Sequence, residues 1–375
     1  MKQHVYADNA ATTQLNKEAF EAMVSWLLDE YGNASQSYAF SRKPKKALAD
    51  ARAIVAACIN AYPEEIFFTS GGTESDNWAI KSSAFGDAKK KAMITSAFEH
   101  HAILNSCQSI ERLGYPVIYL SPTAEGVITP NALKQAITKQ TRMVSVMYAN
   151  NELGTIQPIM ELCKVAHENG ALFHTDAVQA VGHIKIDVQE LGVDMFSASA
   201  HKFNGPKGIG FLYIRKGTEL ISYADGGAQE SAHRAGTENV AAIVGMAKAL
   251  EVNCRDIESN IEYVRGLETQ LLAQLSEAGI DYVRNGGSKT LPGIINLSFA
   301  GADGEAILHR MDLMGISIST SSACDSVNIK ISHVLKAIGL DETLAKGTIR
   351  ISMGKNNTED EVERIVQALN KILKS

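Results

Sequence analysis

Residues 197–213 read SASAHKFNGPKGIGFLY, and this stretch decides how the rest of the chain is interpreted. Lys202 comes directly after the apolar run 193–200, which predicts a strand, and before Pro206 and Gly208, which predict a turn. The neighbours of Lys202 are mostly small, so a flat ligand has room to approach its ε-amino group. An isolated lysine is usually a solvated surface charge. The rest of the chain has to show whether this lysine belongs to a site.

Apolar runs and amphipathic segments alternate on both sides of this stretch. Runs typical of strands occupy residues 64–70, 91–100, 115–122, 141–150, 171–179, 193–200 and 208–214. Segments with helical periodicity occupy 47–61, 71–84, 102–114, 131–137 and 159–170. Such alternation predicts an α/β fold in which helices cover both faces of a mostly parallel sheet.

The pattern changes near residue 240. Long helical segments fill residues 240–279, and short strands and helices follow them. This change predicts a second, smaller α+β unit. We expect a large domain at residues 13–255 and a small domain built from residues 1–12 and 256–375.

Composition and charge limit the classes of function. The chain has 375 residues and a formal net charge of −6, without a long run of basic residues, so we expect no direct nucleic-acid binding. It has no apolar run of the ~18 residues that a membrane span needs. The first residues lack the apolar core of a secretion signal. These features predict a cytoplasmic protein without a membrane partner.

The five cysteines do not form a recognisable cluster. Four of them fall in helical segments, where a small buried hydrophobe is the usual role, namely Cys58, Cys107, Cys163 and Cys254. No C-x-x-C pair is present, which argues against a disulfide framework and a metal site. Cys324 differs, because it lies in STSSACDS (319–326) among small and polar residues.

Polar residues follow five of the predicted strands. They lie at 70–75, 99–101, 150–152, 176–179 and 197–202. Ligands of open α/β sheets bind at the carboxyl ends of the strands, so these residues are expected to meet in one crevice. The segment TSGGTES (69–75) offers backbone N–H groups at a helix start, which suit a phosphate. Asp176 ends an apolar strand, where a carboxylate needs a cationic partner.

Together these parts predict a pyridoxal 5′-phosphate site. Lys202 would form the Schiff base, Asp176 would keep the pyridine nitrogen protonated, and the helix start would bind the phosphate. None of the three signals is specific alone. Their combination gives Lys202 a function.

The chain resembles the cysteine desulfurases, class V members of the fold-type I pyridoxal-phosphate enzymes. The resemblance covers nearly the whole length and rests on motifs in family order. They include YADNAATT (6–13), FTSGGTESDNWAIK (68–81), EHHAIL (99–104), ANNELGTIQP (149–158), HTDAVQAVGHIKID (174–187), SASAHKFNGPKGIGFLY (197–213), GGAQESAHRAGTENV (226–240), STSSACDS (319–326) and TIRISMGK (348–355). It implies a seven-stranded, mostly parallel sheet in the large domain.

The resemblance also implies a role for each matching residue. Lys202 resembles the Schiff-base lysine, Asp176 the partner of the pyridine nitrogen, and His100 the histidine that stacks on the ring. The phosphate-binding positions match Gly72, Thr73, Ser199 and His201, and contacts to the ring hydroxyl or the substrate match Asn151 and Gln179. Thr237 matches a phosphate contact that the family supplies from the partner subunit, which implies a homodimer. Arg350 resembles the arginine that binds the substrate carboxylate.

Cys324 resembles the catalytic nucleophile of this family. The implied reaction converts L-cysteine to L-alanine, leaves a persulfide on Cys324, and hands that sulfur to an acceptor protein. Iron–sulfur cluster assembly, tRNA thiolation and DNA phosphorothioation remain open as pathways. A selenocysteine lyase, another class V enzyme or a non-catalytic cofactor-binding protein remain alternative functions.

Three positions depart from the family pattern. Ser321 replaces a usual glycine, Asp325 follows the nucleophile, and Tyr38 stands where histidine is common. A carboxylate beside Cys324 is expected to make its thiol less acidic. The chain also lacks the long C-terminal extension of some members, which weakens the expectation of a general iron–sulfur supply role.

Overall fold

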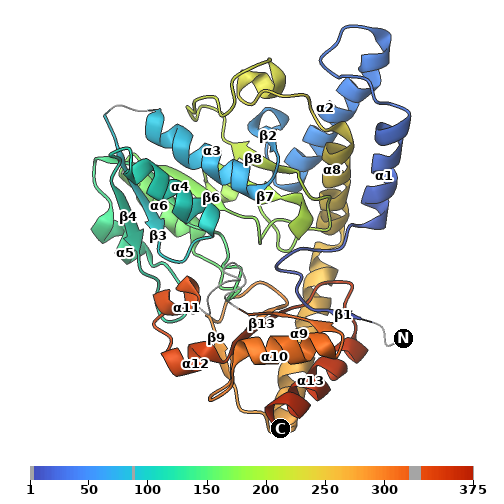
Figure 1. Cartoon of the computed structure of the whole chain (residues 1–375). Helices are drawn as coiled ribbons and strands as arrows, with labels where there is room; N and C mark the ends of the chain where they lie inside the picture. Colours follow the sequence, from blue (N-terminus) through green and yellow to red (C-terminus); the bar gives the residue numbers. More distant parts are fainter. Residues whose placement is uncertain (1–3, 87–88, 321–330, 375) are drawn as a thin grey trace.

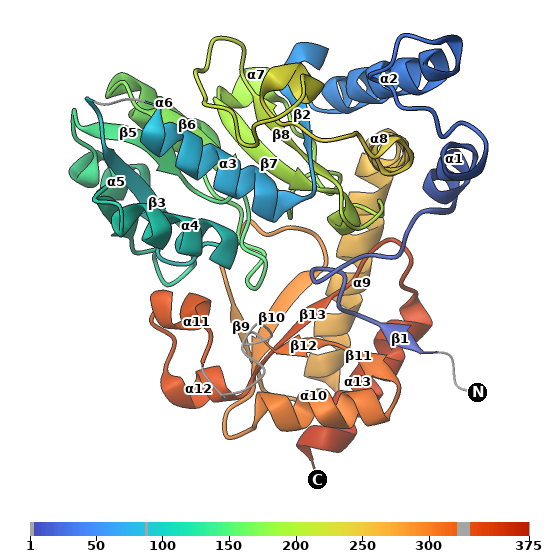
Figure 2. The same ribbon diagram turned by 45° about the horizontal axis from the view of Figure 1, so that its top comes forward.

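The computed structural model describes residues 4–86, 89–320 and 331–374. Figures 1 and 2 show two units, a large one containing a wide sheet and a small one containing shorter strands, joined by a long helix. Ser321, Cys324 and Asp325 lie outside the described residues. Among the described residues, no helix combines the length and apolar character that crossing a bilayer requires.

The large unit is built on a seven-stranded sheet. Its strands lie in the order β2-β8-β7-β6-β5-β3-β4. Neighbouring strands are parallel except at β8, which is antiparallel to both β2 and β7. The bounds are β2 Ile66–Thr69, β3 Ala92–Ser96, β4 Val117–Leu120, β5 Thr141–Ser145, β6 Leu172–Asp176, β7 Met195–Ser199 and β8 Gly210–Ile214. The predicted strands and the mostly parallel α/β architecture are confirmed.

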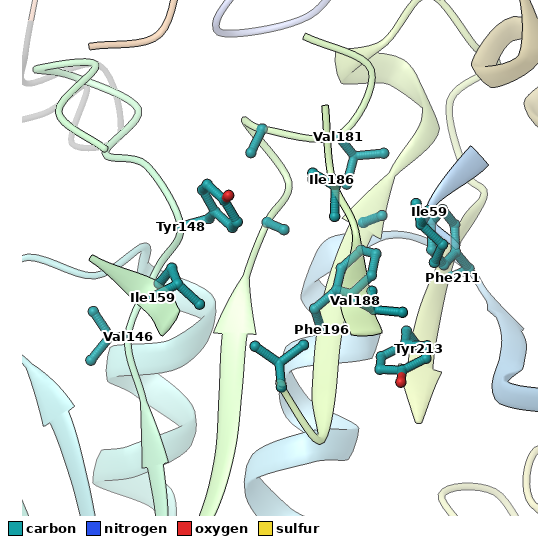
Figure 3. Close-up of a cluster of buried hydrophobic side chains, with 14 of the residues drawn as sticks. Ile59, Val146, Tyr148, Ile159, Val181, Ile186, Val188, Phe196, Phe211 and Tyr213 are labelled. Atoms are coloured by element: carbon teal, nitrogen blue, oxygen red, sulfur yellow. The ribbon is translucent and has the colours of Figure 1, made fainter. Parts of the chain in front are cut away.

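The strands are apolar along their length because both faces of the sheet are covered. Successive side chains of a strand point to opposite faces. Met195 accordingly belongs to the buried cluster under α3 and α4, whereas Phe196 belongs to the cluster on the other face. There Phe196 packs against Phe211 and Tyr213, with each pair of ring centroids 5.6 Å apart (Figure 3). Such two-sided burial explains why the sequence shows continuous apolar runs instead of alternation.

Helices of the large unit pack on these two faces and at one end of the sheet. They are α1 Lys17–Leu28, α2 Arg42–Cys58, α3 Gly72–Phe85, α4 His101–Glu111, α5 Pro130–Ala136, α6 Ile159–Glu168, α7 Val188–Leu191 and α8 Val240–Arg255. Short 3-10 turns are η1 Ala39–Ser41, η2 Pro63–Glu65, η3 Ala200–Lys202 and η4 Gln229–Ala232. Helix α8 packs against α1 and α2 (Figure 1).

The small unit has its own sheet and its own hydrophobic core. Four antiparallel strands lie in the order β12-β13-β10-β9, and the N-terminal strand β1 pairs in parallel with β11. The strands are β1 Val5–Tyr6, β9 Val283–Asn285, β10 Ile294–Ser298, β11 Ile316–Ser317, β12 Ser319–Thr320 and β13 Thr348–Ser352. The helices are α9 Ile257–Glu277, α10 Gly304–Leu313, α11 His333–Ala337, α12 Glu342–Lys346 and α13 Glu359–Leu373.

The division between the units falls between α8 and α9. Buried residues of α8 belong to the core of the large unit, whereas those of α9 share a core with β1, β10, β13 and α13. We propose that the chain divides into two domains here, with 13–255 in the large domain and 1–12 with 256–375 in the small one. Residues of α11 and α12 pack against the core of the large unit and so join the two domains.

Candidate active site

A cavity of about 330 Å³ lies at the carboxyl edge of the large sheet. Its lining comes from the loops and helix starts after five strands of that sheet, from β12 and β13 of the small unit, and from the N-terminal segment. Ten of the predicted site residues line it, namely Gly72, Thr73, His100, Asn151, Asp176, Gln179, Ser199, His201, Lys202 and Arg350. The structure therefore brings together residues that are almost 280 positions apart in the sequence, as expected for the carboxyl ends of parallel strands.

Lys202 projects from η3, directly after β7. Its Nζ atom donates hydrogen bonds to the carbonyl oxygens of Ala10 and Ala11, at 2.5 and 2.8 Å. The amine is thereby held at the wall of the cavity by neutral acceptors. A lysine in this position can exchange those carbonyl contacts for a covalent bond to a ligand carbonyl group.

Asp176 is the last residue of β6 and is buried. Its Oδ1 atom accepts a hydrogen bond of 2.9 Å from the backbone N–H of Val178. Burial raises the pKa of this carboxyl, while the charges of His100 and Lys202 and the Val178 bond lower it. A protonated pyridine nitrogen inside the cavity would supply the cation that a buried carboxylate requires.

The start of α3 forms an anion-binding turn. The N-cap residue Gly71 adopts φ +145° and has no capping side chain, so the first N–H groups of the helix stay available for a ligand. A Cβ atom on Gly72 would lie 2.6 Å from Cγ2 of Val178, which explains why glycine occupies this position. Ser199, at the end of β7, lies beside the same turn.

His100 and His201 contribute imidazoles from two sides of the cavity. His100 is the N-cap of α4, and its Nδ1 atom accepts the N–H of Ala102 at 3.1 Å. Desolvation lowers the pKa of His100, partly offset by the charge of Asp176. His201 contacts Thr12 Oγ1 at 3.2 Å, and desolvation lowers its pKa to about 4. Both rings are therefore neutral near pH 7, in which form an imidazole can stack on an aromatic ring and carry a proton.

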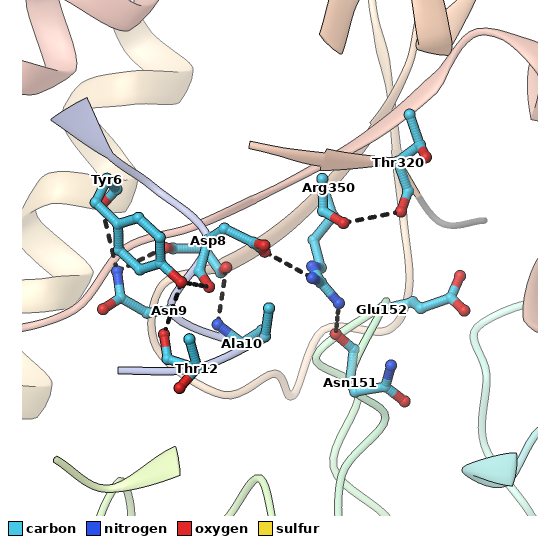
Figure 4. Close-up of polar contacts among 12 residues, drawn as sticks. Tyr6, Asp8, Asn9, Ala10, Thr12, Asn151, Glu152, Thr320 and Arg350 are labelled. Carbon is cyan, nitrogen blue, oxygen red and sulfur yellow. Dashed lines mark hydrogen bonds and ion pairs between the residues drawn. The ribbon is translucent and has the colours of Figure 1, made fainter. Parts of the chain in front are cut away.

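Arg350 reaches the cavity from β13 in the small unit. Its guanidinium donates to the carbonyl oxygen of Asn151 at 3.0 Å and to Oδ1 of Asp8 at 2.7 Å (Figure 4). The side chain is 6% exposed, and its Nε atom has no hydrogen-bond partner among the described residues. A buried guanidinium with one unused donor is suited to bind a carboxylate that enters the cavity.

The N-terminal segment 8–13 closes one side of the cavity. Ala10 provides the carbonyl that accepts hydrogen bonds from both Lys202 and Gln179 Nε2, the latter at 3.0 Å. Asp8 pairs with Arg350. The motif YADNAATT identified this segment. The sequence did not show that the segment contributes mostly backbone carbonyl groups, because every residue type has such a group.

Three buried acids were given no role from the sequence. Asp76 lines the cavity, Glu99 lies beneath it, and Glu152 binds the Ser332 hydroxyl at 2.7 and 2.9 Å. Burial raises the pKa of Glu99 to about 8. Asp76 and Glu152 sit inside quoted motifs, so their positions were visible, but only the fold shows that they are buried together.

Thr237 lies apart from this cavity. It is exposed, in the segment before α8, and it does not line the cavity of its own subunit. That position is compatible with the prediction that Thr237 contacts the phosphate in a partner subunit.

Cys324 lies outside the described residues, but the positions on either side of it are described. Thr320, at the end of β12, lines the cavity, and Ser332 bonds to Glu152, which also lines it.

The cavity fits pyridoxal phosphate in its donor set and its size. A lysine amine, a buried carboxylate, an uncapped helix start next to glycines, and a neutral imidazole surround the same volume. Arg350 lines the same cavity and could bind a substrate carboxylate. Each group of the cofactor would thus meet a complementary group of the chain.

Comparisons with known proteins show the family of the chain. The family model for class V aminotransferases matches residues 5–365. The cysteine desulfurase IscS of Dictyoglomus turgidum is 48% identical over 375 residues, which is all of this chain and 95% of that protein. A solved NifS-like protein superposes with a TM-score of 0.94 at 35% identity, covering 99% of this chain and 100% of that one. A structure of SspA in complex with cysteine superposes with a TM-score of 0.85 at 36% identity, covering 94% and 100%.

Proposed function

Since this chain belongs to the class V aminotransferase family, and within it to the pyridoxal-phosphate-dependent cysteine desulfurases, we propose that it stores the sulfur of L-cysteine as a persulfide on Cys324. The observation that carries the proposal is the convergence of Lys202, Asp176, His100 and Arg350 on one cavity whose wall includes Thr320. STSSACDS continues directly from that wall. A desulfurase needs the electron-withdrawing cofactor and the nucleophilic thiol close together.

Pyridoxal phosphate, when bound, withdraws electrons from the substrate Cα and so makes loss of its proton feasible. Asp176 balances the positive charge on the pyridine nitrogen, and the α3 turn with Ser199 and His201 binds the phosphate. Arg350 binds the substrate carboxylate and fixes the orientation of Cα toward Lys202. The amine of Lys202 would then take the Cα proton, and the neutral imidazole of His100 would be placed to hold or release a proton in the same cavity.

The sulfur transfer follows from the same orientation. The Cys324 thiolate forms a bond to the substrate sulfur as the carbon–sulfur bond breaks, and that bond's electron pair stays on the substrate carbon. A proton added to that carbon, together with return of a proton from Lys202 to Cα, completes L-alanine. Cys324 keeps the sulfur atom as a persulfide until an acceptor thiolate attacks it.

Replacing Arg350 with lysine tests substrate orientation. Lysine keeps the charge but loses the bidentate fork and the geometry that joins Asp8, Asn151 and the substrate. We expect KM for L-cysteine to rise at least ~10-fold while the absorbance of the bound cofactor stays unchanged.

The measurement is alanine and sulfide formation against L-cysteine concentration. Arg112→Lys, an exposed position at the end of α4, is the matched control and should leave KM unchanged. A wild-type KM in Arg350→Lys would show that another group binds the carboxylate.

The acceptor of the sulfur is proposed to be a protein with a reactive cysteine thiol. Iron–sulfur cluster assembly, tRNA thiolation and DNA phosphorothioation all begin with such a transfer, and the site does not distinguish them. Proteins that co-purify with the enzyme, and that gain a sulfur atom from it when L-cysteine is added, would identify the pathway. If no protein thiol accepts the sulfur, the proposal is contradicted.

We further propose that the enzyme works as a homodimer. Large apolar side chains are exposed on α1 and on the segment that follows it, including Leu28 at 70% and Tyr31 at 75%. Such a patch is unusual on a monomer and typical of an interface. Thr237 is exposed and outside its own cavity, as a residue supplied to a second subunit must be.

Light scattering at micromolar protein tests this proposal. We expect the mass of a dimer for the wild type, and that of a monomer with weakened cofactor binding for the double variant Leu28→Lys and Tyr31→Lys. A wild-type monomer that retains full turnover would refute the dimer.

A further inference from the structure

Asp76 is a buried carboxyl group inside the active site to which no role has been given. It lies in α3 and is 1% exposed, and it lines the cavity beside Asp176. One oxygen of each carboxyl and a ring nitrogen of His100 all lie within 4.8 Å of one another. Two buried carboxylates at this distance cannot both carry a charge at low cost, so one of them holds a proton.

Among the described residues, no lysine or arginine lies within ion-pair distance of Asp76. Within the described part of the chain its Oδ1 atom has no hydrogen-bond partner. The nearest basic group, His174 Nε2, is 3.8 Å away. Both nitrogens of that buried ring already contact hydroxyl groups, Ser197 at 3.0 Å and Ser145 at 2.9 Å. Complete burial lowers the pKa of His174 to about 3, so the ring is neutral and does not balance a charge on Asp76.

The surroundings of Asp176 differ. Burial raises the pKa of Asp176 as well, but Asp176 accepts the Val178 N–H and faces Lys202, and both of these favour its anion. Asp76 faces Asp176 and, more distantly, the buried carboxyl of Glu99, and only the Ser197 hydroxyl opposes the effect of burial on it. The pKa of Asp76 is therefore raised well above its ordinary value, chiefly by burial and then by Asp176. The shared proton belongs on Asp76.

We propose that Asp76 is a positioning residue that stays a neutral acid and directs its proton toward Asp176, so that Asp176 is the anion that faces the pyridine nitrogen. The inference rests on the proposed role of Asp176. As a hydrogen-bond donor, Asp76 fixes the orientation of the Asp176 carboxylate and moderates its basicity. The ring of the neutral His174 contacts the hydroxyl groups of Ser145 and Ser197 and lies next to Asp76.

The same conservative change at the two carboxyls separates their roles. Asparagine has the shape of aspartate and a hydrogen-bond donor, but it has no charge. It therefore resembles a protonated aspartate and does not resemble an ionised one. We compare Asp76→Asn and Asp176→Asn in the cofactor-loaded enzyme. The measurements are the cofactor dissociation constant and the pH midpoint of the change in the bound cofactor's absorbance.

For Asp76→Asn we expect a midpoint within about 0.3 pH units of wild type and a dissociation constant within about twofold. For Asp176→Asn we expect the dissociation constant to rise at least ~10-fold, because the pyridinium loses its counterion. Asp76→Ala removes the donor and should weaken cofactor binding about three- to tenfold, less than Asp176→Asn does.

Two results would overturn the inference. A midpoint shift of about one unit or more in Asp76→Asn would mean that Asp76 is ionised in the wild type. A stoichiometric metal ion in the purified holoenzyme that Asp76→Asn removes would assign the carboxyls to a cation instead. If Asp176→Asn binds the cofactor as tightly as the wild type does, the proposed role of Asp176 is wrong. The inference about Asp76 then fails for that separate reason.

Discussion

Lys202→Ala is expected to yield a folded protein that does not retain the cofactor covalently and turns over L-cysteine at least ~10³-fold more slowly. Lys202 is the amine of the site, and its Nζ atom is held by the carbonyls of Ala10 and Ala11 at the cavity wall. Neither of the nearby imidazoles replaces an amine that both bonds the cofactor and takes the Cα proton. The visible absorbance of the bound cofactor and the rate of alanine formation measure the two losses.

The matched control lies in the same stretch. Lys207 is exposed five positions after Lys202, and Lys207→Ala should leave absorbance and turnover unchanged. Turnover in Lys202→Ala at more than a tenth of the wild-type rate would show that the chemistry does not depend on this amine. Loss of folding would be visible as a lowered melting temperature, which we do not expect because the side chain lines a cavity and does not pack in a core.

The second large effect is expected for Cys324→Ser. The serine hydroxyl does not accept a sulfur atom as a thiolate does, so formation of alanine from L-cysteine should fall at least ~10³-fold. Cofactor binding should be unaffected. Exchange of the Cα hydrogen of the substrate with deuterated water should continue, because Lys202 and not the thiol moves that proton.

Cys254→Ser is the control for this variant, since Cys254 is a partly buried thiol of α8 that packs against the core of the large domain. It should retain turnover. Simultaneous loss of turnover and of Cα exchange in Cys324→Ser would mean that the substitution disturbs the cofactor site. Unchanged alanine formation would mean that another group receives the sulfur.

The sequence predicted the sheet well because its strands are buried on both faces. Runs such as TRMVSVMYAN have few polar residues to break them, and helices with one apolar face fall between them. The exception, β8, runs antiparallel because only residues 200–209 separate it from β7, fewer than the dozen or more that a parallel crossover needs. A mostly parallel sheet was expected, and the single reversed strand is compatible with that expectation.

The cavity was predicted in outline from the same logic. Side chains that follow parallel strands have to meet at one edge, so Asp176, His100 and Lys202 could be grouped before their distances were known. Backbone groups could not be assigned in this way. The carbonyls of Ala10 and Ala11 carry no side-chain signature, and the burial of Asp76 depends on how α3 packs against β6 and β7.

The side-chain contacts of Arg350 likewise needed the fold. Its pairing with Asp8 joins positions from opposite ends of the chain, because β1 and the residues after it lie beside β13 in the small domain. The sequence resemblance identified the arginine. Only the structure shows that its buried Nε atom has no hydrogen-bond partner among the described residues.

The most direct test of the account is to find where the sulfur goes. The enzyme is mixed with L-cysteine, its thiols and persulfides are trapped by alkylation, and the peptides are weighed by mass spectrometry. We expect one additional sulfur atom on the peptide that contains Cys324. We expect none on the peptides that contain Cys58, Cys107, Cys163 or Cys254. An extra sulfur on one of those four instead, or alanine release with no sulfur on Cys324, would contradict it.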